Sequence, residues 1–222
     1  MRSPFAPLYF VFFLFVLILL VVFIQVGALA IAFDKLGLSA NSAILLLFSS
    51  FFGSAVNLPL FTIQATPQEE LFHPAGPGGL LRLPMRPFTG KTMVAANVGG
   101  CLIPLGFSLY LTVFHPLPVW QVVVGVAAVA AISYQFSRPI RGVGIGMPIF
   151  IAPVSAAVVA LLLNPEHSAP LAYISGTLGV LCGADLLRLN DIRKLGVPFA
   201  SIGGAGTFDG IFITGIVAVL LA

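Results

Sequence analysis

The chain has 222 residues, of which 59% are hydrophobic and 8% are charged, and its mean hydropathy is +1.11. Soluble domains carry about 25% charged residues, so this composition excludes a protein with an ordinary water-soluble surface. The net charge of +3 comes from 10 basic and 7 acidic residues. Because the basic residues stand between apolar segments, they indicate orientation in a membrane rather than nucleic-acid binding.

Seven apolar segments follow one another, each close to the length of about 20 residues that crosses a bilayer. The first is too long for a secretory signal, whose apolar core has about 7–15 residues. We expect every segment to be a helix, because an open sheet edge cannot be satisfied in lipid and no strand alternation is visible. The predicted fold is an all-α integral membrane protein, one polytopic domain over residues 1–222, with spans at residues 8–33, 41–64, 92–114, 119–137, 143–163, 170–187 and 200–221.

The connection between the second and third segments is the longest. Residues 65–91 contain acidic residues, several prolines and a GPGG turn, all typical of a loop. The stretch is too short to be a domain. The sequence therefore predicts a cytoplasmic Pro/Gly-rich loop here.

The basic residues are sorted between the two sides of the membrane. Lys35 stands alone on one side, and the other nine flank the opposite face: Arg2, Arg82, Arg86, Lys91, Arg138, Arg141, Arg188, Arg193 and Lys194. An excess of Lys and Arg marks cytoplasmic loops. The pattern predicts a multi-pass protein of the cytoplasmic (inner) membrane with its amino terminus inside and its carboxyl terminus outside.

Two acidic residues fall inside predicted spans, Asp185 in LGVLCGADLLRLND and Asp209 in SIGGAGTFDGIFITG. A charge within a span costs about 2.5–3.5 kcal/mol on insertion scales, so such a residue indicates function. The two spans run antiparallel and share a short cytoplasmic loop, so their carboxylates can face each other. Two close carboxyl groups share a proton, and one can then activate a water while the other protonates a substrate carbonyl.

Straight helices would separate these carboxylates in depth, with Asp185 roughly 5 Å and Asp209 roughly 14 Å inside the cytoplasmic boundary. The difference shrinks if Gly203, Gly204 and Gly206 form a non-helical start to the last span. It also shrinks if the sixth span is longer. Either arrangement would make a catalytic pair possible.

Other interpretations stay open. In a purely structural one, Asp185 pairs with Arg188 on the next turn and Asp209 bonds to backbone groups that the glycines free. Broken spans with an acidic residue also form the ion and substrate sites of secondary transporters, and here Asn97, Thr207 and Asp209 would be the ligands of a proton or cation. The chain could also be an accessory subunit of a larger membrane complex.

No metal or cofactor site is expected. Cys101 and Cys182 lie in apolar segments without a CxxC motif, which indicates packing. His73, His115 and His167 all fall in loops, where a histidine is usually solvated.

The chain resembles a prokaryotic membrane-protein family known as domain of unknown function 1614. The likeness lies in NVGGCLIPLGFSLYL, AYISGTLGVLCGADLL and ASIGGAGTFDGIFITGIVAVLLA, and covers roughly residues 92–222. This resemblance implies a membrane location but no particular activity.

A weaker resemblance is to the presenilin and signal-peptide-peptidase class of intramembrane aspartyl proteases. Their sixth span carries one Asp and their seventh carries GxGD, as with Asp185 and Asp209, although Phe208 stands here where the second Gly belongs and no Pro-Ala-Leu motif is present. The resemblance implies an aspartyl hydrolase with these two catalytic residues. The expected partners are membrane lipid, a transmembrane peptide substrate or other membrane subunits, and the expected substrate-binding residues are Gly203, Gly204, Gly206, Thr207 and Asn97.

Overall fold

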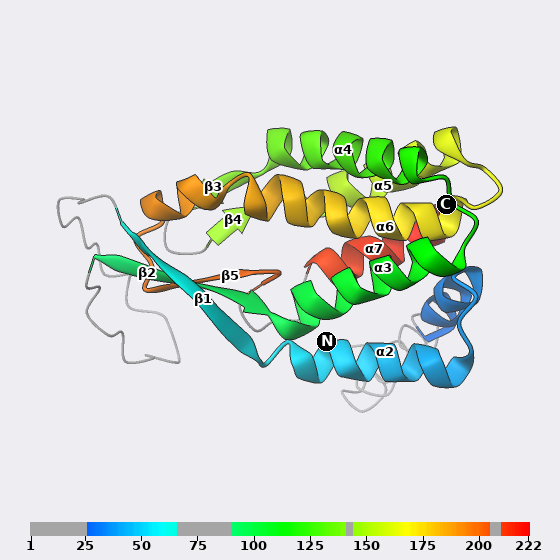
Figure 1. Ribbon diagram of the computed structural model, residues 1–222, viewed down its shortest axis with the longest axis horizontal. Coiled ribbons are helices and arrows are strands. Elements are labelled where there is room, and N and C mark those ends of the chain that lie inside the picture. Colours follow the sequence, from blue (N-terminus) through cyan, green and yellow to red (C-terminus); the bar gives the residue numbers. More distant parts are fainter. Residues whose placement is uncertain (1–25, 66–89, 141–143, 205–209) are drawn as a thin grey trace, which may run out of the picture.

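The computed structural model describes residues 26–65, 90–140, 144–204 and 210–222, without the side chains of residues 212 and 213. Most of this part is helical, and the helices lie side by side with a three-stranded sheet extending from one end (Figure 1). The helices are Val26–Lys35, α2 (Ala40–Gly53), α3 (Ile103–Phe114), α4 (Val119–Phe136), α5 (Ile151–Leu163), α6 (Ser168–Val180) and α7 (Gly210–Leu221). Two π-helical segments, η1 (Val98–Leu102) and η2 (Leu181–Leu186), precede α3 and follow α6, and η3 (Leu189–Lys194) is a 3-10 helix.

The central helix of the bundle is α6, which packs against α3, α4, α5 and α7. All of its residues except Leu178 are buried. Glycines let α4 come close: a methyl group at Gly179 would lie 2.6 Å from the Val129 side chain, and one at Gly183 would collide with the Ala130 backbone. Small residues of this kind are what allow helices in membranes to approach closely.

Two helices are long and apolar enough to cross a bilayer, namely α4 over Val119–Phe136 and α6 with η2 over Ser168–Leu186. Helix Val26–Lys35 and α2, bent by 111° where they meet, make a third candidate if taken together. Two more apolar helices, Val98–Phe114 and Ile151–Leu163, are shorter. The predicted helices at residues 119–137 and 170–187 are confirmed, whereas residues 8–25 lie outside the part of the chain that is described.

The prediction that all seven segments are helical throughout is wrong at four strands. Strand β1 (Asn57–Gln64) forms the second half of the segment at 41–64, and β2 (Lys91–Asn97) opens the segment at 92–114. Strand β4 (Gly144–Gly146) lies at the start of the segment at 143–163, and β5 (Phe199–Ile202) opens the segment at 200–221. Almost all of β1 is exposed. Its apolar residues therefore occupy both faces, and the alternation that would predict a strand is missing.

The sheet has the order β1-β2-β5. Strands β1 and β2 are antiparallel, and β2 and β5 are parallel from Met93 opposite Phe199 to Ala96 opposite Ile202. Pro59 coincides with a register shift in β1, at the edge of the described sheet, where a missing N–H is tolerated. Most of the predicted loop at 65–91 joins β1 to β2 and lies outside the described residues. A second, two-stranded sheet pairs β3 (Arg138–Ile140) with β4 (Gly144–Gly146).

The described basic residues lie at the two ends of the bundle. Lys91 opens β2, Arg138 opens β3 and Arg188 precedes η3, all at the end where the three-stranded sheet lies. Lys35 lies at the other end, where its Nζ donates to the carbonyl of Val219 in the last turn of α7 (3.3 Å). This separation agrees with the sorting of basic residues inferred from the sequence.

Candidate functional site

Asp185 lies in η2, where α6 continues as a π-helix. It is the only charged residue in α3 to α7 and their two π-helical segments as the structure describes them. Its Oδ2 accepts a hydrogen bond from the backbone N–H of Gly203 (2.9 Å). Because π-helical turns inside helices are frequent at functional sites, this residue is the centre of the candidate site.

The chain reverses at Gly203 and Gly204, directly after β5. Both residues have positive φ, 79° and 92°, which glycine adopts without strain. A methyl group at Gly203 would lie 2.7 Å from both Cβ and N of Cys101 in η1. The turn is therefore seated tightly between the two π-helical segments and presents its first N–H to Asp185.

This turn corrects one prediction and confirms another. A helix starting at Ala200 is wrong, because residues 199–202 form β5 and α7 starts only at Gly210. A non-helical start to the last span is confirmed at Gly203 and Gly204. The other expected site residues in this stretch, Gly206, Thr207 and Asp209, lie outside the described residues.

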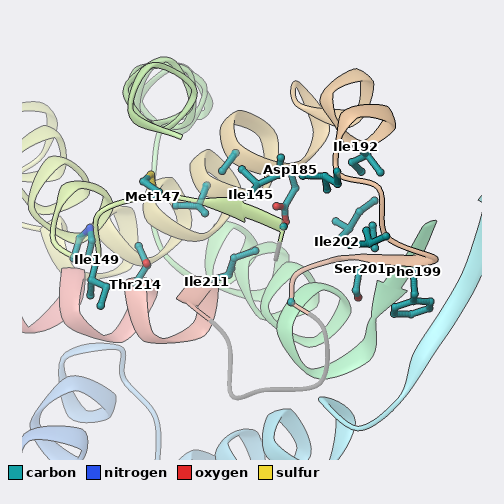
Figure 2. Close-up of a pocket in the computed structure, with 18 of the residues that line it drawn as sticks. Ile145, Met147, Ile149, Asp185, Ile192, Phe199, Ser201, Ile202, Ile211 and Thr214 are labelled. Carbon is teal, nitrogen blue, oxygen red and sulfur yellow. The ribbon is translucent and has the colours of Figure 1, made fainter. Parts of the chain in front are cut away.

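A cavity of about 420 Å³ opens beside Asp185 and is called the inner cavity below. Its walls come from β4, α5, η2, η3, β5 and α7 and are mostly aliphatic (Figure 2). Asp185, Ser201 and Thr214 are the polar side chains among the residues that line it. An apolar pocket with few convergent polar groups is typical of ligand sites.

Asn97 lies apart from this cavity, although the sequence suggested a substrate contact. It is buried, and its Nδ2 donates to the carbonyl of Ser54 (2.7 Å) and to Oδ1 of Asn57 (3.1 Å). Its Oδ1 accepts the N–H of Gly100 (2.7 Å). Ser201 donates to the same Asn57 oxygen (2.6 Å). The described bonds of Asn97 therefore fasten the start of η1 to the end of α2.

Arg188 joins the end of α4 to η3. Its guanidinium donates to Asp191 (3.0 Å) and to the carbonyls of Tyr134 (2.7 Å) and Ser137 (2.8 Å). It also covers the Tyr134 ring, with Cζ 4.1 Å from the ring centre. Lys194 donates to Asp191 as well (2.7 Å), and hydrogen bonds from Lys194 and Arg188 hold the pKa of Asp191 below its ordinary value. Arg188, which the structural interpretation paired with Asp185, thus donates to Asp191 and to the end of α4.

Several parts of the site were not predicted from the sequence. The two π-helical segments have no recognised sequence pattern, and Ser201 and Thr214 looked like ordinary segment residues. Cys101 was expected to pack, and it does pack, against the Gly203 turn. The adjacent pair Gly99-Gly100 was the available sequence signal of close backbone packing at this point, since a methyl group at Gly99 would collide with the backbone of Ser50. Among the described residues no group of three His, Cys, Asp or Glu could hold a metal ion.

These features define a helical protein with membrane-type apolar helices and an acidic residue beside an internal cavity. The model of the family described as protein of unknown function (DUF1614) matches residues 51–221, and the chain belongs to this family. The resemblance inferred for residues 92–222 is thereby confirmed and extends back to the end of α2. No curated protein and no solved structure matches the chain.

Proposed function

We propose that this chain is a seven-span protein of the cytoplasmic membrane with its amino terminus inside. The outward faces support a lipid environment, because large apolar side chains are exposed on α2, α4 and α5, including Phe52, Trp120 and Leu162. Soluble monomers rarely expose contiguous apolar surface on this scale. The separation of Lys35 from the other described basic residues supports the orientation.

Within this topology, we infer that the protein is an intramembrane hydrolase of the aspartyl type, with Asp185 and Asp209 as its catalytic pair. One observation carries the proposal: Ile211, two residues after Asp209 in the sequence, lines the same cavity as Asp185. The reversal at Gly203 supports it further, since the turn ties the chain that leads to Asp209 directly to the Asp185 carboxylate.

The proposed reaction is hydrolysis of a peptide bond in a transmembrane segment. The ionised carboxylate takes a proton from a water whose oxygen attacks the peptide carbonyl carbon, and the protonated partner donates to the carbonyl oxygen. The carbon–nitrogen bond then breaks as the nitrogen gains a proton. Aliphatic walls suit the apolar side chains of such a substrate and limit competing water.

The test is cleavage of reporter transmembrane peptides by the purified full chain in proteoliposomes. Asp185→Asn and Asp209→Asn should each lower the cleavage rate by at least about 100-fold, the scale of acid–base catalysis. Asp191→Asn is the matched control, since Asp191 lies outside the cavity and should leave the rate unchanged. Cleavage that survives both substitutions would remove the pair from catalysis.

A second candidate function is proton- or cation-coupled transport, which the short last helix favours. Helix α7 has 12 residues, or about 18 Å, and begins after a glycine turn that lines a cavity. Broken spans of this kind form the ion sites of secondary transporters. In this proposal Asp209→Asn abolishes pH-dependent solute flux into proteoliposomes, and flux that persists would contradict it.

A further inference from the structure

The rim of the inner cavity is apolar. Three of the residues that line it are exposed, namely Ile149 (75%), Phe150 (74%) and Phe199 (39%), and the others are buried or partly buried. Large apolar side chains are favoured where they leave water, so an exposed rim of this kind suits hydrocarbon. Within the proposed membrane topology, the cavity therefore opens toward the bilayer.

The rim also continues one side of α5, which begins directly after Phe150. Val154, Val158 and Leu162 follow Phe150 at intervals of four residues and are exposed as well (47%, 50% and 79%). Residues at this spacing lie on one face of a helix. A segment in the bilayer that packs along this face of α5 would meet the cavity at Phe150.

The cavity is elongated. Figure 2 shows Thr214 toward one end and Ser201 toward the other, with Asp185 between them. On α7 the lining runs from Ile211 to Val217, six residues or about 9 Å of helix. The volume of about 420 Å³ is within the range of roughly 300–1,000 Å³ that is typical of ligand pockets. The cavity therefore suits a narrow, elongated ligand.

Thr214 places a hydroxyl group in the apolar wall. The residue is 5% exposed, and its methyl carbon Cγ2 lies toward Gly176 of α6. Its hydroxyl makes no hydrogen bond with the part of the chain that the structure describes. By contrast, Thr112 of α3 donates to the Ser108 carbonyl of its own helix (2.8 Å). Because buried hydroxyls are usually hydrogen-bonded, a ligand that accepts from Thr214 would complete the bonding of this side chain.

The polar side chains of the cavity favour a peptide over a hydrocarbon chain. Thr214, Asp185 and Ser201 are spread along its length (Figure 2). A lipid chain carries polar groups at one end only, whereas a peptide carries a carbonyl and an N–H at every residue. A peptide can therefore meet several of these side chains at once.

We propose that the inner cavity receives its substrate sideways from the bilayer, past Ile149 and Phe150, and that Thr214 donates a hydrogen bond to a peptide carbonyl of that substrate. A helix that opens for hydrolysis loses backbone hydrogen bonds that lipid cannot replace, and Thr214 supplies one of them. The inference rests on the proposed function for the choice of a transmembrane peptide. Thr214 binds the substrate and transfers no proton.

The first experiment measures peptide binding without hydrolysis. The full chain with Asp209→Asn is placed in lipid nanodiscs, and the affinity for a fluorescent reporter transmembrane peptide is determined. Thr214→Val keeps the shape of the side chain but removes the hydroxyl, and should weaken binding by about three- to tenfold, the effect of one hydrogen bond. Thr214→Ser keeps the hydroxyl and should bind within about twofold of the original. The control Thr112→Val makes the same change outside the cavity and should also stay within about twofold.

The two substitutions at Thr214 separate binding from packing. If the methyl group matters because it packs toward Gly176, Thr214→Ser weakens binding and Thr214→Val does not. That order would overturn the role of the hydroxyl. Equal affinity in both variants and the original would overturn it as well.

The second experiment locates the entrance. A photoreactive benzoylphenylalanine replaces Phe150 or, as the matched control, Leu162, which lies on the same face of α5 about 18 Å further along. The reporter peptide should cross-link at position 150 and stay at background at position 162. Equal cross-linking at both positions would overturn the entrance, and cross-links to lipid alone at position 150 would overturn the peptide as occupant.

Neither measurement depends on catalysis, so the two proposals fail separately. A peptide that binds as expected but stays intact with the unsubstituted chain would support the binding site and contradict hydrolysis. A peptide that is cleaved although it cross-links equally at both positions would support hydrolysis and contradict the entrance.

Discussion

Replacement of Gly203 by alanine tests how tightly the glycine turn is seated beside Asp185. A positive φ costs an L-residue about 1–2 kcal/mol. The new methyl group would lie 2.7 Å from Cβ and N of Cys101, and overpacking of this kind costs about 1–3 kcal/mol. We therefore expect Gly203→Ala to lower the free energy of unfolding by about 2–5 kcal/mol. Relief of the clash would also move the N–H away from Asp185, so cleavage should fall as well.

Two other glycines separate the contributions. Gly196 also has positive φ, 68°, but a methyl group there meets no atom within 4 Å, so Gly196→Ala should cost only about 1–2 kcal/mol. Gly106 lies in helix α3 with open space around it, and Gly106→Ala should stabilise the protein by about 0.5–1 kcal/mol. The difference in unfolding free energy between Gly203→Ala and Gly196→Ala therefore isolates the contact with Cys101.

The assay is equilibrium unfolding of the three variants in the same detergent. Circular dichroism reports the helices, and the single tryptophan, Trp120, gives an independent fluorescence signal. If Gly203→Ala costs no more than Gly196→Ala, the turn is not packed against η1 and the reasoning about the site is refuted.

Three further predictions use the same unfolding assay. Asp185→Asn retains an oxygen that can accept the Gly203 N–H, so the variant should stay folded while it loses cleavage; loss of the folded state would contradict this. Asp191 has a lowered pKa, so its contribution to stability is present above the unfolded value of about 3.9 and is lost as the pH falls through its lower folded value. Asp191→Asn should thus flatten the acid limb of the stability profile below about pH 4, and an unaltered limb would exclude this role. Asn97→Ala leaves the Ser54 carbonyl and the Gly100 N–H without their described side-chain partner and should cost about 2–5 kcal/mol; a cost below about 1 kcal/mol would show that water replaces the amide.

Hydropathy predicted the helices where apolar residues fill a whole span. Both α4 and α6 were located to within a few residues, because each is bounded by loops rich in Pro, Arg or Asn and contains no strand. Hydropathy did not predict the structure where a shorter helix is joined to an apolar strand. Residues 41–64 are apolar throughout, yet the chain leaves α2 after Gly53 and becomes extended at Asn57.

The limit at the site has a different physical origin. An acidic residue in an apolar segment is visible in any sequence, so Asp185 was identified. The cluster of glycines indicated a non-helical turn at Gly203, and glycine adopts the positive φ observed there without strain. The parallel pairing of β2 with β5 is not readable, because it depends on how α3 to α6 fold back between them. Asn97 was misplaced for a related reason: its amide partners, Ser54 and Asn57, lie in the preceding apolar segment, 43 and 40 residues earlier in the chain.

The parallel pairing of β2 with β5 also sets an order for biosynthesis. Thr92, in β2, donates through its hydroxyl to the carbonyl of Val197, 105 residues later in the chain. At about 5–20 residues per second, a ribosome needs about 5–20 s to make that interval. During this time α3, α4, α5 and α6 are synthesised while the edge of β2 still awaits β5. The glycine turn can reach Asp185 only afterwards, so the nascent protein has no complete site until nearly all of its helices have been made.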